Sequence, residues 1–314
     1  MKYYSRFVKT ILTLLLVFIL ETTLLFAQKI QPKRIIYDTD ICLDVDDVGA
    51  LALLHALENK GESKLLAVVF NEVHPNGAPA IDAINTWYGR GDIPIGIYKD
   101  TLNKPDKSPY LDAVAKFPHD IKASYAPSAL NVYRKALKGQ PDGSVTIISV
   151  GFLNNLNDLL IAEPKLVAKK VKELVIMAGL NNDGFNLTRH DLTEVSINVI
   201  ENWPTPLVIS HNGGSIRTGE ILKDAPEANP VREGFYKFFK DSYKGRSSWD
   251  ELAVLYGVRG VGTIFNEVTS GTGSLPNGYV WNMKPGFRSH LEHKISDPEF
   301  IKIIEELMMV PPIK

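Results

Sequence analysis

A chain of 314 residues with near-average composition is long enough for one large α/β domain and a short leader. Its 35 basic and 36 acidic residues give a net charge of −1, which offers no reason to expect nucleic acid or an anionic membrane as a partner. The single cysteine, Cys42, excludes an internal disulfide.

Residues 1–27 have the pattern of a secretory signal peptide. Three basic residues precede an apolar run over residues 11–20, and the segment ends L-F-A at Ala27. We therefore predict a cleaved leader, residues 1–27, and one exported domain, residues 28–314, in the periplasm or outside the cell. The apolar run also suits a membrane anchor, but Glu21 and two threonines interrupt it, so we expect no stable membrane insertion after cleavage.

The most informative stretch follows an apolar run at residues 35–37. Five carboxylates occur within ten residues, and an apolar helical pattern begins directly after them, which predicts strand, acidic loop and helix. The five are Asp38, Asp40, Asp44, Asp46 and Asp47. Like charges so close together repel one another, so they either face water or hold a cation, and oxygen ligands suit Ca²⁺ or Mg²⁺. Asp46 and Asp47 also suit the first turn of a helix, where carboxylates complement the helix dipole.

Strand and helix patterns then alternate along the chain. The predicted strands are residues 65–71, 93–97, 145–150, 173–177 and 207–210, and the predicted helices are residues 78–88 and 128–138, with a further helix opening at residues 214–219. This alternation predicts a single α/β domain whose mostly parallel sheet has helices on both faces. In such a sheet ligands bind at the carboxyl ends of the strands, where the acidic loop lies.

Several motifs resemble one known family. D-T-D followed by D-D and an A-L-A-L helix resembles the opening of the inosine-uridine-preferring nucleoside hydrolase family, whose usual form is D-T-D-x-G-x-D-D. Here the spacing is two residues longer, as in a bacterial exported branch of that family, and Cys42 stands near the family glycine. W-D-x-x-A-V-L-Y, residues 249–256, is similar to the family's H-D-P-x-A-V-A-Y segment. Residues 171–179 and 185–191 resemble two further family motifs, so the nucleoside hydrolase-like resemblance runs from about residue 33 to 312.

This resemblance implies a calcium ion and a substrate site. The implied metal ligands are Asp40, Asp47, Asp250 and the backbone carbonyl of Val150. Asp40 would also be catalytic and take the proton from the attacking water. The implied substrate-binding residues are Asp46, Asn76, Met177, Asn186 and Trp249. The implied function is calcium-dependent hydrolysis of the N-glycosidic bond of ribonucleosides to ribose and free base, with a small-molecule nucleoside as the partner.

Two residues depart from the family pattern. Gly184 stands where the family has glutamate, so one sugar contact is absent or is supplied by Asp183. Trp249 stands where many members have a histidine that assists the leaving base, and an indole has no titratable proton to give, so leaving-group activation is unassigned. Trp249 also suits core packing, and Asp250 also suits the N-cap of the helix that follows.

Two other classes of function stay open. A haloacid dehalogenase-type phosphatase also begins with D-x-D after an apolar strand, although the residues after Asp40 do not fit that family. Gly184 and Trp249 favour a non-catalytic calcium-dependent nucleoside- or sugar-binding protein on the same fold.

Cys42 is not expected to be a catalytic thiol, because carboxylates nearby would raise its pKa. The leaving group and the oligomeric state, a homo-oligomer included, are not fixed.

Three histidines fall in predicted loops near strand ends, namely His74, His190 and His211. Each suits the protein surface better than a catalytic role.

Overall fold

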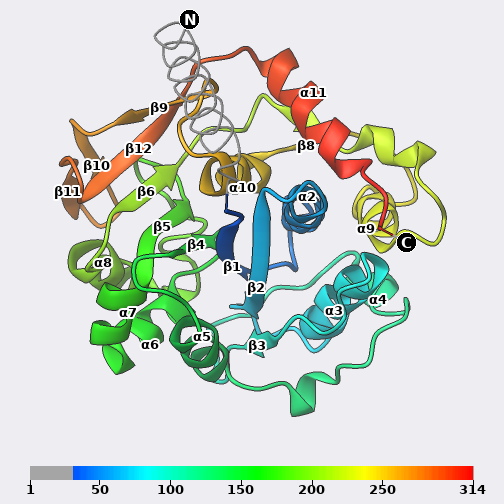
Figure 1. Cartoon of the computed structure of the whole chain (residues 1–314), viewed down its shortest axis with the longest axis horizontal. Coiled ribbons are helices and arrows are strands. Elements are labelled where there is room, and N and C mark those ends of the chain that lie inside the picture. Colours follow the sequence, from blue (N-terminus) through cyan, green and yellow to red (C-terminus); the bar gives the residue numbers. More distant parts are fainter. Residues whose placement is uncertain (1–30, 314) are drawn as a thin grey trace, which may run out of the picture. The chain divides into compact units, whose positions relative to one another are not determined.

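The computed structural model of the chain describes residues 31–313, so the predicted leader lies outside the described residues. Its main sheet is built from β1 (Lys33–Thr39), β2 (Ser63–Phe70), β3 (Ile95–Ile97), β4 (Val145–Ser149), β5 (Val171–Met177), β6 (Leu207–Ser210), β9 (Phe265–Val268) and β12 (Arg288–His293). The strand order is β3-β2-β1-β4-β5-β6-β12-β9 (Figure 1). Neighbouring strands run parallel except for β9, which is antiparallel to β12.

Helices cover both faces of this sheet (Figure 1). One face carries α2 (Asp46–Asn59), α3 (Gly77–Trp87), α9 (Pro230–Phe238), α10 (Trp249–Arg259) and α11 (Asp297–Met308). The other face carries α5 (Ala129–Lys138), α6 (Asn154–Ala162), α7 (Pro164–Lys170) and α8 (Thr193–Asn202). The remaining elements are short: α4 (Leu111–Val114), the 3₁₀ turns η1 (Ala123–Tyr125), η2 (Arg189–Asp191) and η3 (Glu220–Asp224), and the ribbons β7 (Arg217–Thr218) with β8 (Arg246–Ser247) and β10 (Thr272–Ser274) with β11 (Val280–Asn282).

The alternation of side chains along β1 divides the interior into two cores. Ile35 and Tyr37 pack into the core beneath α2 and α10, whereas Ile36 packs into the core beneath α5 and α6. The alternation continues into the acidic loop, so that Asp38 turns towards α5 and Thr39 turns towards α2. Successive residues of this one strand therefore have different roles at its carboxyl end.

The predicted α/β fold with a mostly parallel sheet is confirmed, and each of the five strands predicted after the acidic loop is present with shifted or equal bounds. The prediction was wrong at residues 214–219, because this segment contains the short strand β7 and a 3₁₀ turn follows it. It also omitted β9 to β12, whose residues are mostly polar. Within residues 31–313, no helix combines the length and apolar character needed to cross a membrane.

His55 is a buried histidine of α2, and it affects how stability depends on pH. Its Nε2 lies 2.8 Å from Asn85 Oδ1, and its ring stacks on Tyr88 with centroids 4.6 Å apart. Burial lowers the pKa of His55 from 6.5 to about 3. As the pH falls below 6.5, His55 becomes protonated in the unfolded chain, whereas in the folded chain it stays neutral until about pH 3. The stability due to neutral His55 is therefore complete above pH 6.5 and is lost progressively between these two values.

We expect His55→Gln to reduce this pH-dependent loss of stability, because glutamine can still bond to Asn85 but does not titrate. Between pH 7 and pH 5 the parent should lose about 2 kcal/mol more free energy of unfolding than the variant, since each pH unit below the unfolded pKa is worth about 1.4 kcal/mol. Urea unfolding followed by circular dichroism at both pH values measures the difference. Parallel losses in parent and variant would contradict the role given to His55.

Candidate active site

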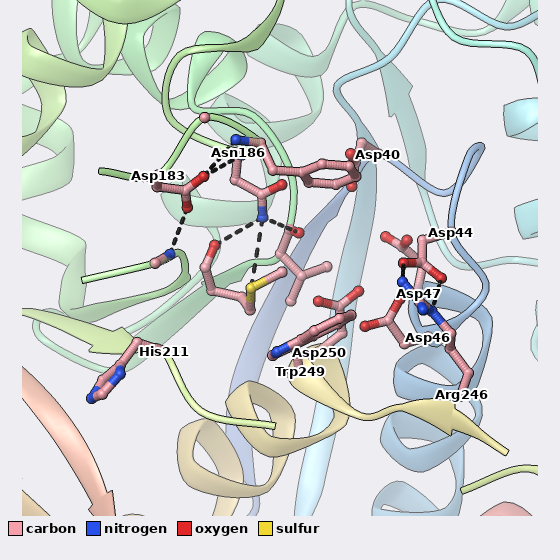
Figure 2. Close-up of a pocket in the computed structure, with 15 residues that line it drawn as sticks. Asp40, Asp44, Asp46, Asp47, Asp183, Asn186, His211, Arg246, Trp249 and Asp250 are labelled. Carbon is pink, nitrogen blue, oxygen red and sulfur yellow. Dashed lines mark hydrogen bonds and ion pairs between the residues drawn. The ribbon is translucent and has the colours of Figure 1, made fainter. Parts of the chain in front are cut away.

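A cavity of about 340 Å³ opens where the strands end. Its lining comes from the acidic loop, the ends of β4, β5 and β6, the loop after β5 and the start of α10. The residues are Asp40, Asp44, Asp46, Asp47, Val150, Met177, Gly179, Asp183, Gly184, Phe185, Asn186, His211, Arg246, Trp249 and Asp250. Figure 2 shows the acidic residues of α2 on one side of this cavity and Asp183 with Asn186 on the other.

Asp38 is the one carboxylate of the acidic loop that does not line the cavity. Its oxygens accept hydrogen bonds from Tyr133 Oη at 2.6 Å, Asn71 Nδ2 at 2.7 Å and Asn155 Nδ2 at 3.4 Å. Burial raises the pKa of Asp38 to about 7, although these three bonds favour its ionised form. Asp38 thus ties β1 to α5, α6 and the end of β2, and it fixes the strand end from which Asp40 follows.

Asp46, Asp47 and Asp250 form a cluster of buried carboxylates. One oxygen of each lies within 4.8 Å of the others. Burial raises the pKa of all three well above the usual range, and repulsion from neighbouring carboxylates, Asp40 among them in each case, raises it further. Asp46 Oδ2 and Asp250 Oδ1 are buried and have no hydrogen-bond partner within residues 31–313. Carboxylates in this arrangement stay ionised only with a compensating positive charge, so the cluster could hold a metal ion.

Local structure explains why these three meet. Asp46 and Asp47 occupy the first turn of α2, and Thr39 Oγ1 donates a hydrogen bond to Asp47 Oδ1. Asp250 occupies the first turn of α10, whose N-cap residue is Ser248, so the N-cap role considered for Asp250 was wrong. Because α10 packs directly against α2, two helix starts far apart in sequence place their carboxylates together.

Asp40 lines the same cavity and is 7% exposed. Burial raises its pKa to about 7, and the positive charge of Arg189 opposes that rise. Gly151 lies against it, since a Cβ at this glycine would stand 2.7 Å from Asp40 Oδ1. Asp40 is outside the group of three oxygens that lie within 4.8 Å of one another. Asp40 therefore lines the same cavity as the cluster without being one of its three members.

Amide and carbonyl groups line the opposite wall. Asn186 Nδ2 donates to the carbonyl oxygens of Val150 at 3.1 Å and Met177 at 3.0 Å, whereas its Oδ1 is buried without a partner among the described residues. Asp183 accepts hydrogen bonds from the backbone N–H groups of Gly179, Phe185 and Asn186, which folds this loop into a tight wall. The structure thus brings Val150, Met177 and Asn186 together with the carboxylates.

Comparison with known proteins identifies the family. The family model described as inosine-uridine preferring nucleoside hydrolase matches residues 35–259, which is well over half of the chain. This chain belongs to that family. The resemblance seen in the sequence is confirmed, and the protein is a nucleoside N-glycosyl hydrolase. A search of the curated proteins finds no match by sequence.

Solved structures of related fold are similar to this nucleoside hydrolase over nearly their whole length. An inosine-guanosine nucleoside hydrolase is 17% identical, with a TM-score of 0.67, covering 88% of this chain and 98% of that chain. The inosine-uridine preferring nucleoside hydrolase from Bacillus anthracis is 17% identical, with a TM-score of 0.62, covering 88% and 99%. The type III effector XopQ, solved with adenosine diphosphate ribose, is 14% identical, with a TM-score of 0.67, covering 92% and 95%. At these identities the likeness shows the fold alone.

Asn76 is the predicted site residue that the structure leaves outside the lining of this hydrolase's cavity. It occupies the N-cap position of α3 without a side-chain capping bond, and its Nδ2 donates to Asp112 Oδ1 at 2.8 Å. The asparagine nearest the strand end is Asn71, which is buried directly after β2 and bonded to Asp38 and to the carbonyl of Phe152. Its position immediately after an apolar strand is the signal that could have drawn attention to it.

Trp249 lines the cavity and is half-buried, so it does not belong to the hydrophobic core. The indole packs against the backbone of Gly213 and Gly214. A Cβ at Gly213 would lie 2.7 Å from Trp249 Cα, and Gly213 has φ +150°, so the turn after β6 is shaped to admit this side chain. Phe185, 43% exposed, is a second aromatic side chain on the lining.

Sequence reasoning missed the two arginines near this site. Arg246 lines the cavity, and Arg189 lies over the ring of Phe185 at 4.2 Å and forms an ion pair with Asp106. Their ion-pair partners, Asp106 for Arg189 and Asp44 for Arg246, are distant in sequence, so no local pattern reveals them. His211 is the one predicted loop histidine on the cavity lining. Burial raises the pKa of the Cys42 thiol, and Glu72 and Asp40 raise it further, in agreement with the prediction that this cysteine is not a nucleophile.

Proposed function

We propose that this hydrolase cleaves the N-glycosidic bond of ribonucleosides in a calcium-dependent reaction that gives ribose and a free base. The observation that carries the proposal is the arrangement of the cavity. A buried carboxylate cluster lies on one side, and two of its oxygens have no partner among residues 31–313. An amide and an aromatic wall lie on the other sides. A ribose needs polar groups for its hydroxyls, and a base needs an apolar face.

The donor set fits calcium. Asp46, Asp47 and Asp250 offer carboxylate oxygens, and Asp40 and the Val150 carbonyl line the same cavity. Calcium takes six to eight oxygen ligands in flexible geometry, and no nitrogen or sulfur group belongs to the three-carboxylate cluster. When bound, a calcium ion supplies positive charge that lowers the pKa of water and attracts sugar hydroxyls.

Asp40 would accept the proton of the attacking water. Its carboxylate is buried and lines the cavity, as a general base that acts on a water there must. Asp46 Oδ2 and Asn186 Oδ1 are buried acceptors without partners among the described residues, and they would receive hydrogen bonds from the ribose hydroxyls. Holding the sugar in one orientation lowers the entropy cost of reaching the transition state.

Trp249 would form a wall for the leaving base. An indole cannot protonate a departing base, but it can stack on one. The likeness to an inosine-guanosine and an inosine-uridine nucleoside hydrolase makes purine nucleosides and uridine the first substrates to test. The leader predicted for residues 1–27 would place this reaction in the periplasm or outside the cell.

The test is to incubate the mature protein with Ca²⁺ and a panel of inosine, guanosine, adenosine, uridine, cytidine and p-nitrophenyl riboside, and to measure free ribose by a reducing-sugar assay. We expect release from at least one nucleoside, loss of activity with a chelator and recovery on adding Ca²⁺. Nucleoside binding without ribose release would favour the non-catalytic binding protein instead. Activity unchanged by the chelator would contradict the calcium dependence.

A further inference from the structure

Two of the features in which this chain departs from the family pattern lie side by side in the structure. The acidic loop is two residues longer than the usual form, and Trp249 replaces the usual histidine. Asp44, from the longer loop, is bound to Arg246, and Arg246 lies over the indole of Trp249 (Figure 2). One arginine thus joins the metal side of the cavity to its aromatic wall.

The contact between Asp44 and Arg246 is bidentate. Arg246 Nε donates to Asp44 Oδ1 at 2.7 Å, and Arg246 Nη2 donates to Asp44 Oδ2. Both residues are only partly exposed, with side-chain exposures of 27% for Arg246 and 14% for Asp44. A planar guanidinium fixed at two points has a defined orientation, which a single contact would not give it.

Asp44 itself is held by its own loop. Its Oδ1 accepts a hydrogen bond from the backbone N–H of Val45 at 2.8 Å, and its carbonyl accepts one from Tyr110 Oη. Arg246 lies on β8, which pairs with β7 directly before α10 begins. The two ends of this ion pair therefore sit on backbone that is fixed by other contacts.

The guanidinium carbon of Arg246 lies 4.9 Å from the centroid of the Trp249 ring. Gly213 and Gly214 approach the same side chain, with a Cβ at Gly214 standing 3.7 Å from the indole Nε1. Loss of the guanidinium would remove one packing partner of the indole, and a half-buried tryptophan would then have other rotamers open to it.

We propose that Asp44 and Arg246 are positioning residues that hold the Trp249 indole as the stacking wall for the leaving ring. The proposal rests on the proposed function, because it names the part of that site that recognises the base. It specifies that the substrate carries a flat aromatic leaving group, and that binding of the ring depends on Asp44 although Asp44 does not touch it.

The first experiment compares Asp44→Asn and Arg246→Met with the parent. The readouts are KM and kcat for a cleaved nucleoside and the inhibition constant of free ribose, which has no ring. We expect KM to rise about 3- to 10-fold in each variant, the range that loss of a partly buried cation–π contact allows. The inhibition constant of ribose should stay within about twofold, since the contacts proposed for the sugar are elsewhere. Equal weakening of ribose and nucleoside would overturn the proposal, because the pair would then act on the acidic loop as a whole.

A matched control comes from the same chain. Arg259 and Glu62 form another bidentate pair, with bonds of 2.8 and 3.0 Å, that is not part of the cavity lining. Arg259→Met and Glu62→Gln should leave KM for the nucleoside unchanged. In a Trp249→Ala background, Arg246→Met should add nothing to the rise in KM, because the wall it holds is gone. A full further rise in that background would overturn the positioning role.

A second measurement does not depend on catalysis. The emission of Trp249 is obtained by subtracting the fluorescence of Trp249→Ala from that of the parent. The same subtraction is made in the Asp44→Asn background and in the Arg246→Met background, each with and without Trp249→Ala. We expect this emission to move to longer wavelength when either partner is lost, as the indole becomes more exposed to water. An unchanged emission would overturn the proposal even if no nucleoside is cleaved, and a shift without any ribose release would contradict only the proposed function.

Discussion

Asp40→Asn should lower turnover of the cleaved nucleoside by at least about 10²-fold while substrate binding survives. Asparagine keeps the size of the side chain and one oxygen, but it cannot accept the proton of the attacking water. Asp40 lies on the cavity lining, outside the group formed by Asp46, Asp47 and Asp250, so the charge of that cluster is unchanged. The loss should therefore appear in kcat much more than in KM.

Steady-state kinetics with Ca²⁺ in excess, together with calorimetric binding of a slowly cleaved nucleoside, separate these two effects. The same variant should still be stabilised by Ca²⁺ in a thermal melt, which shows that the site is intact. Asp112→Asn, a change of the same chemistry at the exposed partner of Asn76, serves as the control and should leave turnover at the parental level. Turnover of Asp40→Asn near the parental level would rule out Asp40 as the base.

The amino-terminal half of the fold could be predicted because its signals are local. An apolar run followed by five carboxylates and an apolar helical pattern predicts a strand, an acidic loop and a helix. The structure has this order, with β1 before the loop and α2 after it. The carboxyl-terminal strands lack such a signal. β12 carries Arg288 at a buried position, where its guanidinium donates to the carbonyls of Ile200 at 2.6 Å and Trp203 at 3.1 Å. A buried arginine satisfied by carbonyls nearly ninety residues away cannot be recognised from apolar periodicity.

The site residues also divide into those with a local sequence signal and those that only tertiary packing brings together. Asp46 and Asp47 could be located from their own stretch of sequence, whereas Asp250 could be joined to them only through the family resemblance, since the packing of α10 on α2 creates the proximity. Asp44 was one of five carboxylates expected either to face water or to hold a cation, but its partner is Arg246, 202 residues later. Whether a carboxylate binds a cation or an arginine depends on tertiary neighbours, and composition cannot distinguish these cases.

Asp47→Ala should abolish the stabilisation of the protein by Ca²⁺. Asp47 is buried within the carboxylate cluster, bonded to Thr39 and repelled by Asp40 and Asp46. A ligand that binds only the folded state stabilises it by about 4 kcal/mol at a concentration of 1,000 times its Kd, so a functional site gives a large upward shift in melting temperature. Removing one of three carboxylates takes away both a ligand and the charge that balances the cation.

Without Ca²⁺ the same variant should lose little stability, because deleting one buried carboxylate relieves repulsion among the others. A large loss of the Ca²⁺-induced shift together with a small change in stability without Ca²⁺ distinguishes a metal ligand from a residue that only packs. Thermal melts of chelator-treated protein with and without added Ca²⁺ measure it, with Asp142→Ala, an exposed carboxylate paired with Lys170, as the matched control that keeps the parental shift. If Asp47→Ala still rises in melting temperature with Ca²⁺ as the parent does, the cation is held elsewhere and the cluster of Asp46, Asp47 and Asp250 is not its site.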